Sequence, residues 1–249
     1  AQVTAVTVVD ETRLYQVGPV PLGGAAAASS LREHRVRVTR ELIESAIHSL
    51  EEQCAAEGVS LTVLRERGDP FGLLSQHARY NDLMIFGLRS MFEYDLLGPR
   101  DVDPATVLND LAKGGVSPIL VVSEQYRTVR RVLFAQSGSV QAANAMKQFV
   151  RLRLWPDVRF RIIACDGPEE KSREMLEGAR AYCLSHGIEA DSVHRPGSAR
   201  EEILREVASW DADLIVLGYS GRRPITVRLF GATGLHVLRN VDRPLFLSQ

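Results

Sequence analysis

The feature that most constrains this chain is an internal repeat, because its two halves carry the same landmarks in the same order. Residues 81–87 (NDLMIFG) resemble residues 212–218 (ADLIVLG), and the glycines that close these segments lie 131 residues apart. An earlier pair of glycines, Gly68 and Gly197, is separated by 129 residues. Such similar separations predict two copies of one structural unit.

Two further landmarks extend the repeat and locate an insertion in the first copy. Residues 118–121 (PILV) precede residues 244–247 (PLFL) by 126 positions, whereas residues 8–10 (VVD) precede residues 164–166 (ACD) by 156. The first copy therefore holds 27 additional residues, and most of them fall in residues 12–35, which include glycines, prolines, alanines and serines. This composition is typical of a long loop, so we expect a mobile insertion.

Strand and helix patterns alternate along the second half. Apolar runs predict strands at residues 132–135, 158–165, about 188–194, 213–218 and 244–247. Helical spacing predicts helices at residues 140–154, 169–186, 199–210 and 233–240. This order predicts a doubly wound parallel sheet, in which ligands bind at the carboxyl ends of the strands. We therefore expect two α/β domains of this class, at residues 1–125 and 126–249.

The first half shows the same order without its beginning. Residues 2–9, 38–56, 61–64 and 71–80 match the second copy from its second strand onward. A sheet that lacks a central strand would leave the backbone groups of two neighbouring strands unpaired, which is costly when they are buried. We expect that the native chain begins upstream of Ala1, or that this strand comes from elsewhere.

Composition narrows the class of partner. Thirty basic and 31 acidic side chains give a net charge of −1, which predicts neither a nucleic-acid nor a membrane partner. Cys54, Cys165 and Cys183 are widely spaced and indicate neither a disulfide framework nor a metal site. Because the sequence shows no membrane-spanning run and no signal peptide, we expect a cytoplasmic protein.

A glycine pattern follows the fourth predicted strand of the second copy. The segment 218–221 (GYSG) is followed by nine residues and then by 231–233 (GAT), which opens the last predicted helix. Glycines let several backbone N–H groups turn toward a phosphate, and the start of a helix favours an anion. Arg222 and Arg223 add positive charge. The alternative is that these glycines only form tight turns.

These motifs make residues 130–249 resemble the universal stress protein family. Its nucleotide-binding members carry G-x-x-G, nine residues, and then G followed by Ser or Thr, whereas here Ala232 stands at that last position and Thr233 follows. The first strand of the family commonly ends in Asp-Gly-Ser, and here Ser137 replaces the aspartate, which in the family lies beside the nucleotide. The resemblance implies the adenine nucleotide alpha hydrolase-like fold and a stress-response or regulatory role. It also implies binding of ATP or a related adenine nucleotide, with or without Mg²⁺.

The cofactor-binding residues that the resemblance implies are Ser137, Gly218, Gly221, Arg222, Gly231, Ala232 and Thr233. In the first half, Ser90 and Arg100 stand in the places of Gly221 and Gly231, which predicts a degenerate site.

We assign no catalytic residue, because the sequence contains neither HExxH nor GxSxG. Asp10 and Asp166 follow strands and are expected to cap turns. The resemblance implies at most slow ATP hydrolysis or self-phosphorylation, for which Ser220, Thr226 and Thr233 would be nearby hydroxyls.

An alternative function is a nucleotide-independent scaffold that captures a protein partner through residues 12–35 or 88–104. The family also commonly dimerises through its final strand. The two final strands here, residues 118–122 and 244–247, could pair in the same way as an internal pseudo-dimer and cover two sheet edges. Further association into a homodimer is compatible with this arrangement.

Overall fold

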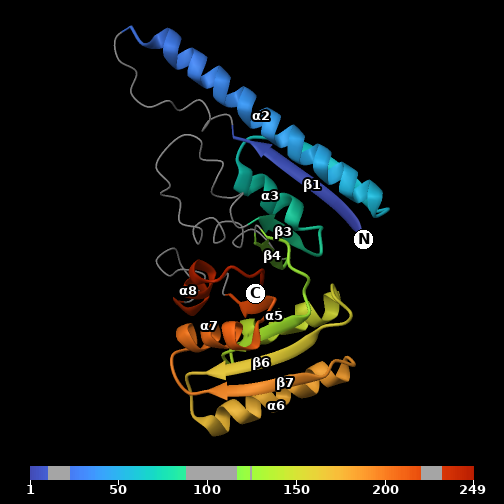
Figure 1. Cartoon of the computed structure of the whole chain (residues 1–249), viewed down its shortest axis with the longest axis vertical. Helices are drawn as coiled ribbons and strands as arrows, with labels where there is room; N and C mark the ends of the chain where they lie inside the picture. Colours follow the sequence, from blue (N-terminus) through green and yellow to red (C-terminus); the bar gives the residue numbers. More distant parts are fainter. Residues whose placement is uncertain (11–22, 88–116, 124, 220–231) are drawn as a thin grey trace. The chain divides into compact units, whose positions relative to one another are not determined.

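The computed structural model describes residues 1–10, 23–87, 117–123, 125–219 and 232–249, in which strands and helices alternate (Figure 1). The first half contains β1 (Gln2–Val9), α2 (Ala25–Ala56), β2 (Ser60–Arg67), α3 (Pro70–Ala78), β3 (Met84–Gly87) and β4 (Ile119–Val122). The second half contains β5 (Arg131–Gln136), α5 (Val140–Leu152), β6 (Arg159–Cys165), α6 (Glu169–Ser185), β7 (Ala190–Arg195), α7 (Ala199–Trp210), β8 (Leu214–Gly218), α8 (Ala232–Asn240) and β9 (Leu245–Ser248).

Two compact units divide the chain. Of the described residues, the first unit comprises 1–10 and 23–77, and the second comprises 78–87, 117–123, 125–219 and 232–249. Strands β3 and β4 of the first repeat therefore belong to the same compact unit as the whole of the second repeat.

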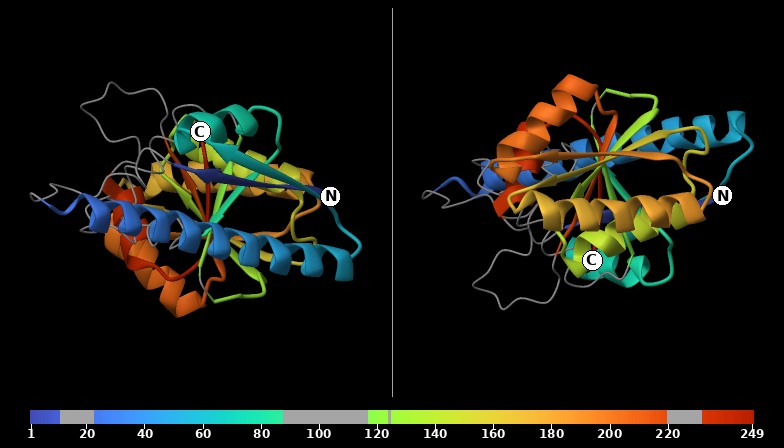
Figure 2. Two further views of the ribbon diagram at one scale, coloured as in Figure 1. Left: turned by 90° about the horizontal axis from the view of Figure 1, so that it is seen from above. Right: turned by 90° about the horizontal axis from the view of Figure 1, so that it is seen from below.

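The second unit is built on a seven-stranded sheet with the order β3-β4-β9-β8-β5-β6-β7. Its five strands from the second half, β5 to β9, are parallel to one another. Helices α5 and α6 cover one face of these strands, and α7 and α8 lie on the other (Figure 2). The predicted doubly wound α/β class is confirmed.

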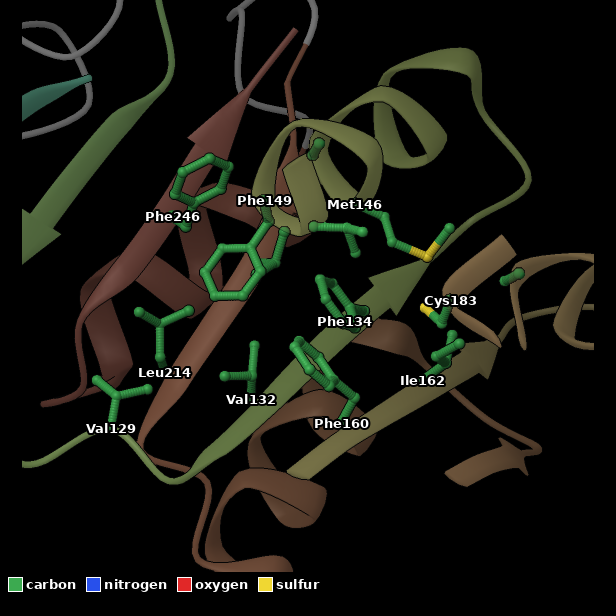
Figure 3. Close-up of a cluster of buried hydrophobic side chains, with 14 of the residues drawn as sticks. Val129, Val132, Phe134, Met146, Phe149, Phe160, Ile162, Cys183, Leu214 and Phe246 are labelled. Carbon is green, nitrogen blue, oxygen red and sulfur yellow. The ribbon is translucent and has the colours of Figure 1, made fainter. Parts of the chain in front are cut away.

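Strand β5 forms the centre of this unit because both of its faces are buried. Val132, Leu133 and Phe134 are each at most 1% exposed. Phe134 stacks on Phe160 of β6 with ring centroids 5.2 Å apart, and Phe149 of α5 meets the Phe134 ring edge-on at 5.6 Å (Figure 3). Offset-stacked and edge-on aromatic pairs add to the stabilisation that burial of their apolar area provides.

Strands β4 and β9 pair antiparallel in this sheet. The register places Ile119 opposite Leu247, and Val121 opposite Leu245. All four side chains are buried. The predicted pairing of the two final strands is therefore confirmed, and each strand covers an edge of the other.

The internal repeat is visible in equivalent turns. Gly68 and Gly197 follow β2 and β7 with φ angles of +132° and +135°. The Gly68 amide donates to the Val9 carbonyl, and the Asp166 amide donates to the Gly197 carbonyl, each at 3.2 Å. Both turns therefore connect the ends of two adjacent parallel strands, although the glycine donates in the first repeat and accepts in the second.

Helices α2 and α6 also end alike. Gly58 and Gly187 have φ angles of +64° and +74°, the left-handed conformation that closes a Schellman motif. The residue after each glycine donates to the carbonyl of a buried cysteine, Cys54 at 2.8 Å and Cys183 at 3.0 Å. The two cysteines occupy equivalent positions in the repeat.

The first unit contains β1 and β2 as a parallel pair, from Gln2 opposite Ser60 to Val9 opposite Arg67. The four strands of the first half are thus divided between two sheets, with β1 and β2 in one and β3 and β4 at an end of the other. The expected additional first strand stays a prediction.

The prediction of a loop over residues 12–35 is wrong for its second part. Helix α2 already begins at Ala25 and runs for 32 residues, whereas its counterpart α6 has 17. Alanine has the highest helix propensity, so the run of alanines that suggested low complexity instead extends the helix. Of the two segments proposed as contact surfaces, residues 12–22 of the first (12–35) and all of the second (88–104) lie outside the described residues. None of the helices in the described ranges combines the length and the apolar character that a membrane crossing requires.

A buried carboxylate joins the start of β8 to the segment that precedes β5. Asp213 is 5% exposed, and its Oδ2 accepts hydrogen bonds from the amides of Arg130 and Arg131 at 3.0 and 2.9 Å. Its Oδ1 accepts from the Arg127 guanidinium at 2.8 Å. Asp211, which is also bonded to Arg127, has a pKa below its usual value because of this guanidinium.

Asp213→Asn should lower the free energy of unfolding by about 2–4 kcal/mol, because the amide NH₂ replaces an acceptor that faces N–H donors. Urea unfolding followed by circular dichroism measures the change. Asp242→Asn is the matched control. The Asp242 side chain is 84% exposed and pairs with Arg243, so this substitution should change stability by less than about 1 kcal/mol. Equal effects of the two substitutions would contradict the structural role of Asp213.

Alkaline pH should destabilise the fold through its buried thiols. Burial raises the pKa of both Cys165 and Cys183 to about 11. Their unfolded pKa is lower, so the unfolded state ionises first, and stability present below about pH 8.5 is lost as the pH rises toward 11. With a reductant present, Cys183→Ala should make this loss shallower in urea titrations between pH 8 and 11. An unchanged pH dependence would contradict the assignment.

Candidate functional site

The carboxyl ends of β5 and β8 meet at the topological switch point of the sheet. These two strands are neighbours, but from β5 the chain continues outward through β6 and β7, whereas β8 leads to β9 on the other side. A crevice at such a point is the usual ligand site of doubly wound sheets. The residues that end the two strands are Gln136 and Gly218.

Gly218 lets the first turn of α5 lie directly on the end of β8. A Cβ atom at this position would lie 2.6 Å from the Gln141 carbonyl oxygen and would also overlap the carbonyl carbon of Gln141 and the amide nitrogen of Ala142. All three are backbone atoms, so no side-chain movement could make room. The glycine that closes the strand motif is therefore required by a close approach of two backbones.

The turn between β5 and α5 is built from small polar residues. Gly138 has a φ of +76°, which glycine adopts without strain, and Ser139 is the N-cap, whose Oγ accepts from the Ala142 amide at 3.1 Å. The exposed hydroxyl of Ser137 lies 3.0 Å from the Ser139 hydroxyl. Sequence reasoning placed Ser137 correctly at the end of β5.

Gln136 supports this turn and was not singled out from the sequence. Its side chain is buried, and its Nε2 donates to the Ala142 carbonyl at 3.3 Å and lies 3.6 Å from the Met146 sulfur. The available signal was an amide side chain at the end of an otherwise apolar strand, directly before a Ser-Gly-Ser turn.

The segment after β8 begins from a fixed position. The Tyr219 amide donates to the Ser248 carbonyl at 2.8 Å. Tyr219 is 3% exposed, and this burial raises the pKa of its hydroxyl. The predicted residues Gly221, Arg222 and Gly231 lie outside the described residues. Ala232 and Thr233 form the start of α8. The structure thus brings together Ser137 and Gly218 at the switch point, and places the other two described residues in the first turn of a helix.

Asp166 ends β6 and serves a different helix from the one that follows it. Its φ of +53° is left-handed, and its Oδ2 accepts from the Ala199 amide at 2.9 Å. Ala199 is the first residue of α7, so this carboxylate compensates a helix N-terminus. The expected capping carboxylate therefore caps the start of α7, which is distant in sequence, rather than the turn that directly follows β6.

Charge is distributed unevenly among the helix starts of the second unit. The first turns of α6 and α7 each contain two glutamates, which compensate the positive end of the helix dipole. The first turns of α5 and α8 contain no acidic residue. The first turns of the helices that follow the two switch-point strands therefore carry no negative side chain, although the Ser139 hydroxyl caps one N–H group of α5.

Two hollows among the described residues lie elsewhere, along β7. Their volumes are about 790 and 500 Å³, and Arg180 and Asp191 line both. In the smaller one, Arg161 and Arg195 direct their guanidinium groups to the buried Glu206, at 2.9 and 3.0 Å. Glu206 and Asp191, which lies 3.5 Å from Arg161, offset two of the three arginine charges around this hollow.

The fold and the position of the switch point define a doubly wound α/β protein with its candidate site where β5 and β8 end. Residues 128–248 match the model of the universal stress protein family. The second half of the chain is therefore a domain of this family.

Individual relatives agree with this assignment. A universal stress protein of Synechocystis is 24% identical over 66% of the chain, which spans 56% of the length of that relative. The crystal structure of a universal stress protein from Archaeoglobus fulgidus has a TM-score of 0.67, at 20% identity, over 87% of this chain and 79% of that one. The crystal structure of a putative universal stress protein from Pseudomonas aeruginosa has a TM-score of 0.56 at 16% identity, and the match covers 100% of this chain and 93% of that one. These structures share the fold across both halves.

Gly218→Ala should lower the free energy of unfolding by about 2–4 kcal/mol, because the added methyl group meets backbone atoms of α5. Gly178→Ala is the matched control. Gly178 lies within α6, where an added Cβ has nothing within 4 Å, so this substitution should stabilise the protein by about 0.5–1 kcal/mol. Urea unfolding of both variants measures the difference, and a neutral Gly218→Ala would contradict the close approach.

Proposed function

We propose that this protein is a cytoplasmic stress-response or regulatory module that binds ATP or a related adenine nucleotide in residues 126–249. The observation that carries the proposal is the spacing of glycines 218, 221 and 231, which begins where β8 reaches the switch point. The first of these glycines is described, and its contact with α5 explains why no larger residue would fit there.

The electrostatics of the described residues support an anionic ligand. A nucleotide carries its negative charge on the phosphates, which favour backbone N–H groups at a helix N-terminus. Helices α5 and α8 begin without acidic residues, whereas the first turns of α6 and α7 are acidic. Along the carboxyl edge of the sheet, the ends of β5 and β8 are thus a more favourable place for phosphates than the ends of β6 and β7.

The first half, residues 1–125, has a different role under this proposal. Ser90 and Arg100 stand where the second half has Gly221 and Gly231, so the proposal assigns no nucleotide to it. Its strand β4 pairs with β9, which makes the first half a support for the sheet that carries the candidate site. Any hydrolysis or self-phosphorylation at the second half would be slow.

Titration calorimetry with ATP tests the proposal. The intact protein should bind ATP, and Gly221→Val combined with Gly231→Val should remove the binding, because the added side chains would fill the space that phosphates need. Gly178→Val is the control, since it places the same side chain on an open helix surface and should leave binding unchanged. No heat of binding with the intact protein would refute the nucleotide function.

A nucleotide-independent scaffold is the second candidate, favoured by Ser137 and Ala232. The first is an exposed serine in the place of the family's aspartate, and the second occupies the position of the family's small hydroxyl residue. Partner capture by the intact protein should then be the same with and without ATP. A pull-down whose captured proteins change on addition of ATP would count against this alternative.

A further inference from the structure

The resemblance to nucleotide-binding relatives raises the question of whether a divalent cation accompanies the nucleotide. Mg²⁺ binds oxygen ligands, and protein sites for Mg²⁺ with nucleotides usually supply one or two carboxylates besides the phosphates. A Mg²⁺ site at the ends of β5 and β8 would therefore need at least one carboxylate there.

The switch-point strands end without a carboxylate. Ser137 follows β5 with an exposed hydroxyl that lies 3.0 Å from the Ser139 hydroxyl, and β8 ends in Gly218, which has no side chain. A neutral hydroxyl is a much weaker Mg²⁺ ligand than the aspartate that the family commonly has at position 137. The residues at the ends of these two strands thus do not fit a resident cation.

The carboxylate at the end of the next strand is already engaged. Asp166 ends β6, which is separated from β8 by β5, and its Oδ2 accepts from the Ala199 amide. Moving this carboxylate toward a cation would leave the start of α7 without that acceptor. In the ranges that the structure describes, no three histidine, cysteine, aspartate or glutamate side chains gather closely enough to hold a metal ion.

Positive potential is supplied by the protein itself. The starts of α5 and α8 keep their dipole charge because no glutamate or aspartate lies in their first turns. A cation added to such a place would be repelled, while a free phosphate chain would be attracted. Both observations, the missing carboxylates at the strand ends and the lack of acidic side chains at the two helix starts, favour the same ionic form of the ligand.

We infer that this site takes the nucleotide as its free anion, without a bound Mg²⁺. The inference rests on the nucleotide function proposed above and specifies the ligand: a nucleoside polyphosphate whose charge is met by helix N-termini. Since Mg²⁺ reduces the negative charge of ATP, chelating the cation should leave the affinity unchanged or increase it.

Titration calorimetry of the intact protein with ATP, in excess Mg²⁺ and in excess EDTA, tests the inference. The Kd in EDTA should be no more than about threefold above the Kd in Mg²⁺, or lower than it. Binding that weakens tenfold or more in EDTA would overturn the Mg²⁺-free form while leaving the nucleotide function intact. Absence of binding in both buffers would overturn the nucleotide function itself.

A charge introduced at the end of β5 provides a second measurement. Ser137→Asp restores the carboxylate and should weaken ATP binding in EDTA at least fivefold through repulsion, with part of the loss recovered in Mg²⁺. Ser192→Asp adds the same charge at an exposed position on β7 and should leave both Kd values unchanged. Unfolding curves confirm that both variants are folded. A Ser137→Asp variant that binds ATP in EDTA as well as the unsubstituted protein would contradict the inference.

Discussion

The organisation of the second unit depends on the contact between the end of β8 and the first turn of α5. Backbone meets backbone at Gly218, so the distance between helix and sheet is fixed by the absence of a side chain. The same turn is held from the other side, because Ser139 caps the helix and Gln136 donates to the Ala142 carbonyl. The end of β8 and the start of α5 are thereby brought to one point of the sheet, and Tyr219, which follows β8, is held by the Ser248 carbonyl.

Much of this fold could be predicted because the repeat and the apolar runs are local properties of the sequence. The strand that closes at Gly218 and the helix that starts after Ser139 were both located from their residues. The extension of α2 could not be predicted in this way. Alanines next to glycines and serines suit either a loop or a helix, and only the wider structure selects between them.

The candidate site was predictable in position and only partly in chemistry. Spacing places Gly218 at the carboxyl end of a strand, whereas the position of that strand next to β5 comes from the structure. Sequence distance does not reveal that Asp166 serves the start of α7, since Ala199 lies 33 residues further along the chain. The role of Gln136 was hidden for a similar reason, because its partners are defined by how α5 returns over the strand.

The antiparallel β4–β9 pair gives the molecule a property that two separate copies of one domain would not have. Both strands belong to one polypeptide, so their pairing does not weaken on dilution, and the two repeats are always present in equal amounts. In a homodimer each substitution appears in both subunits, whereas here a substitution in one repeat leaves the other repeat unchanged. One repeat is therefore free to lose a ligand site while the other retains the ancestral one.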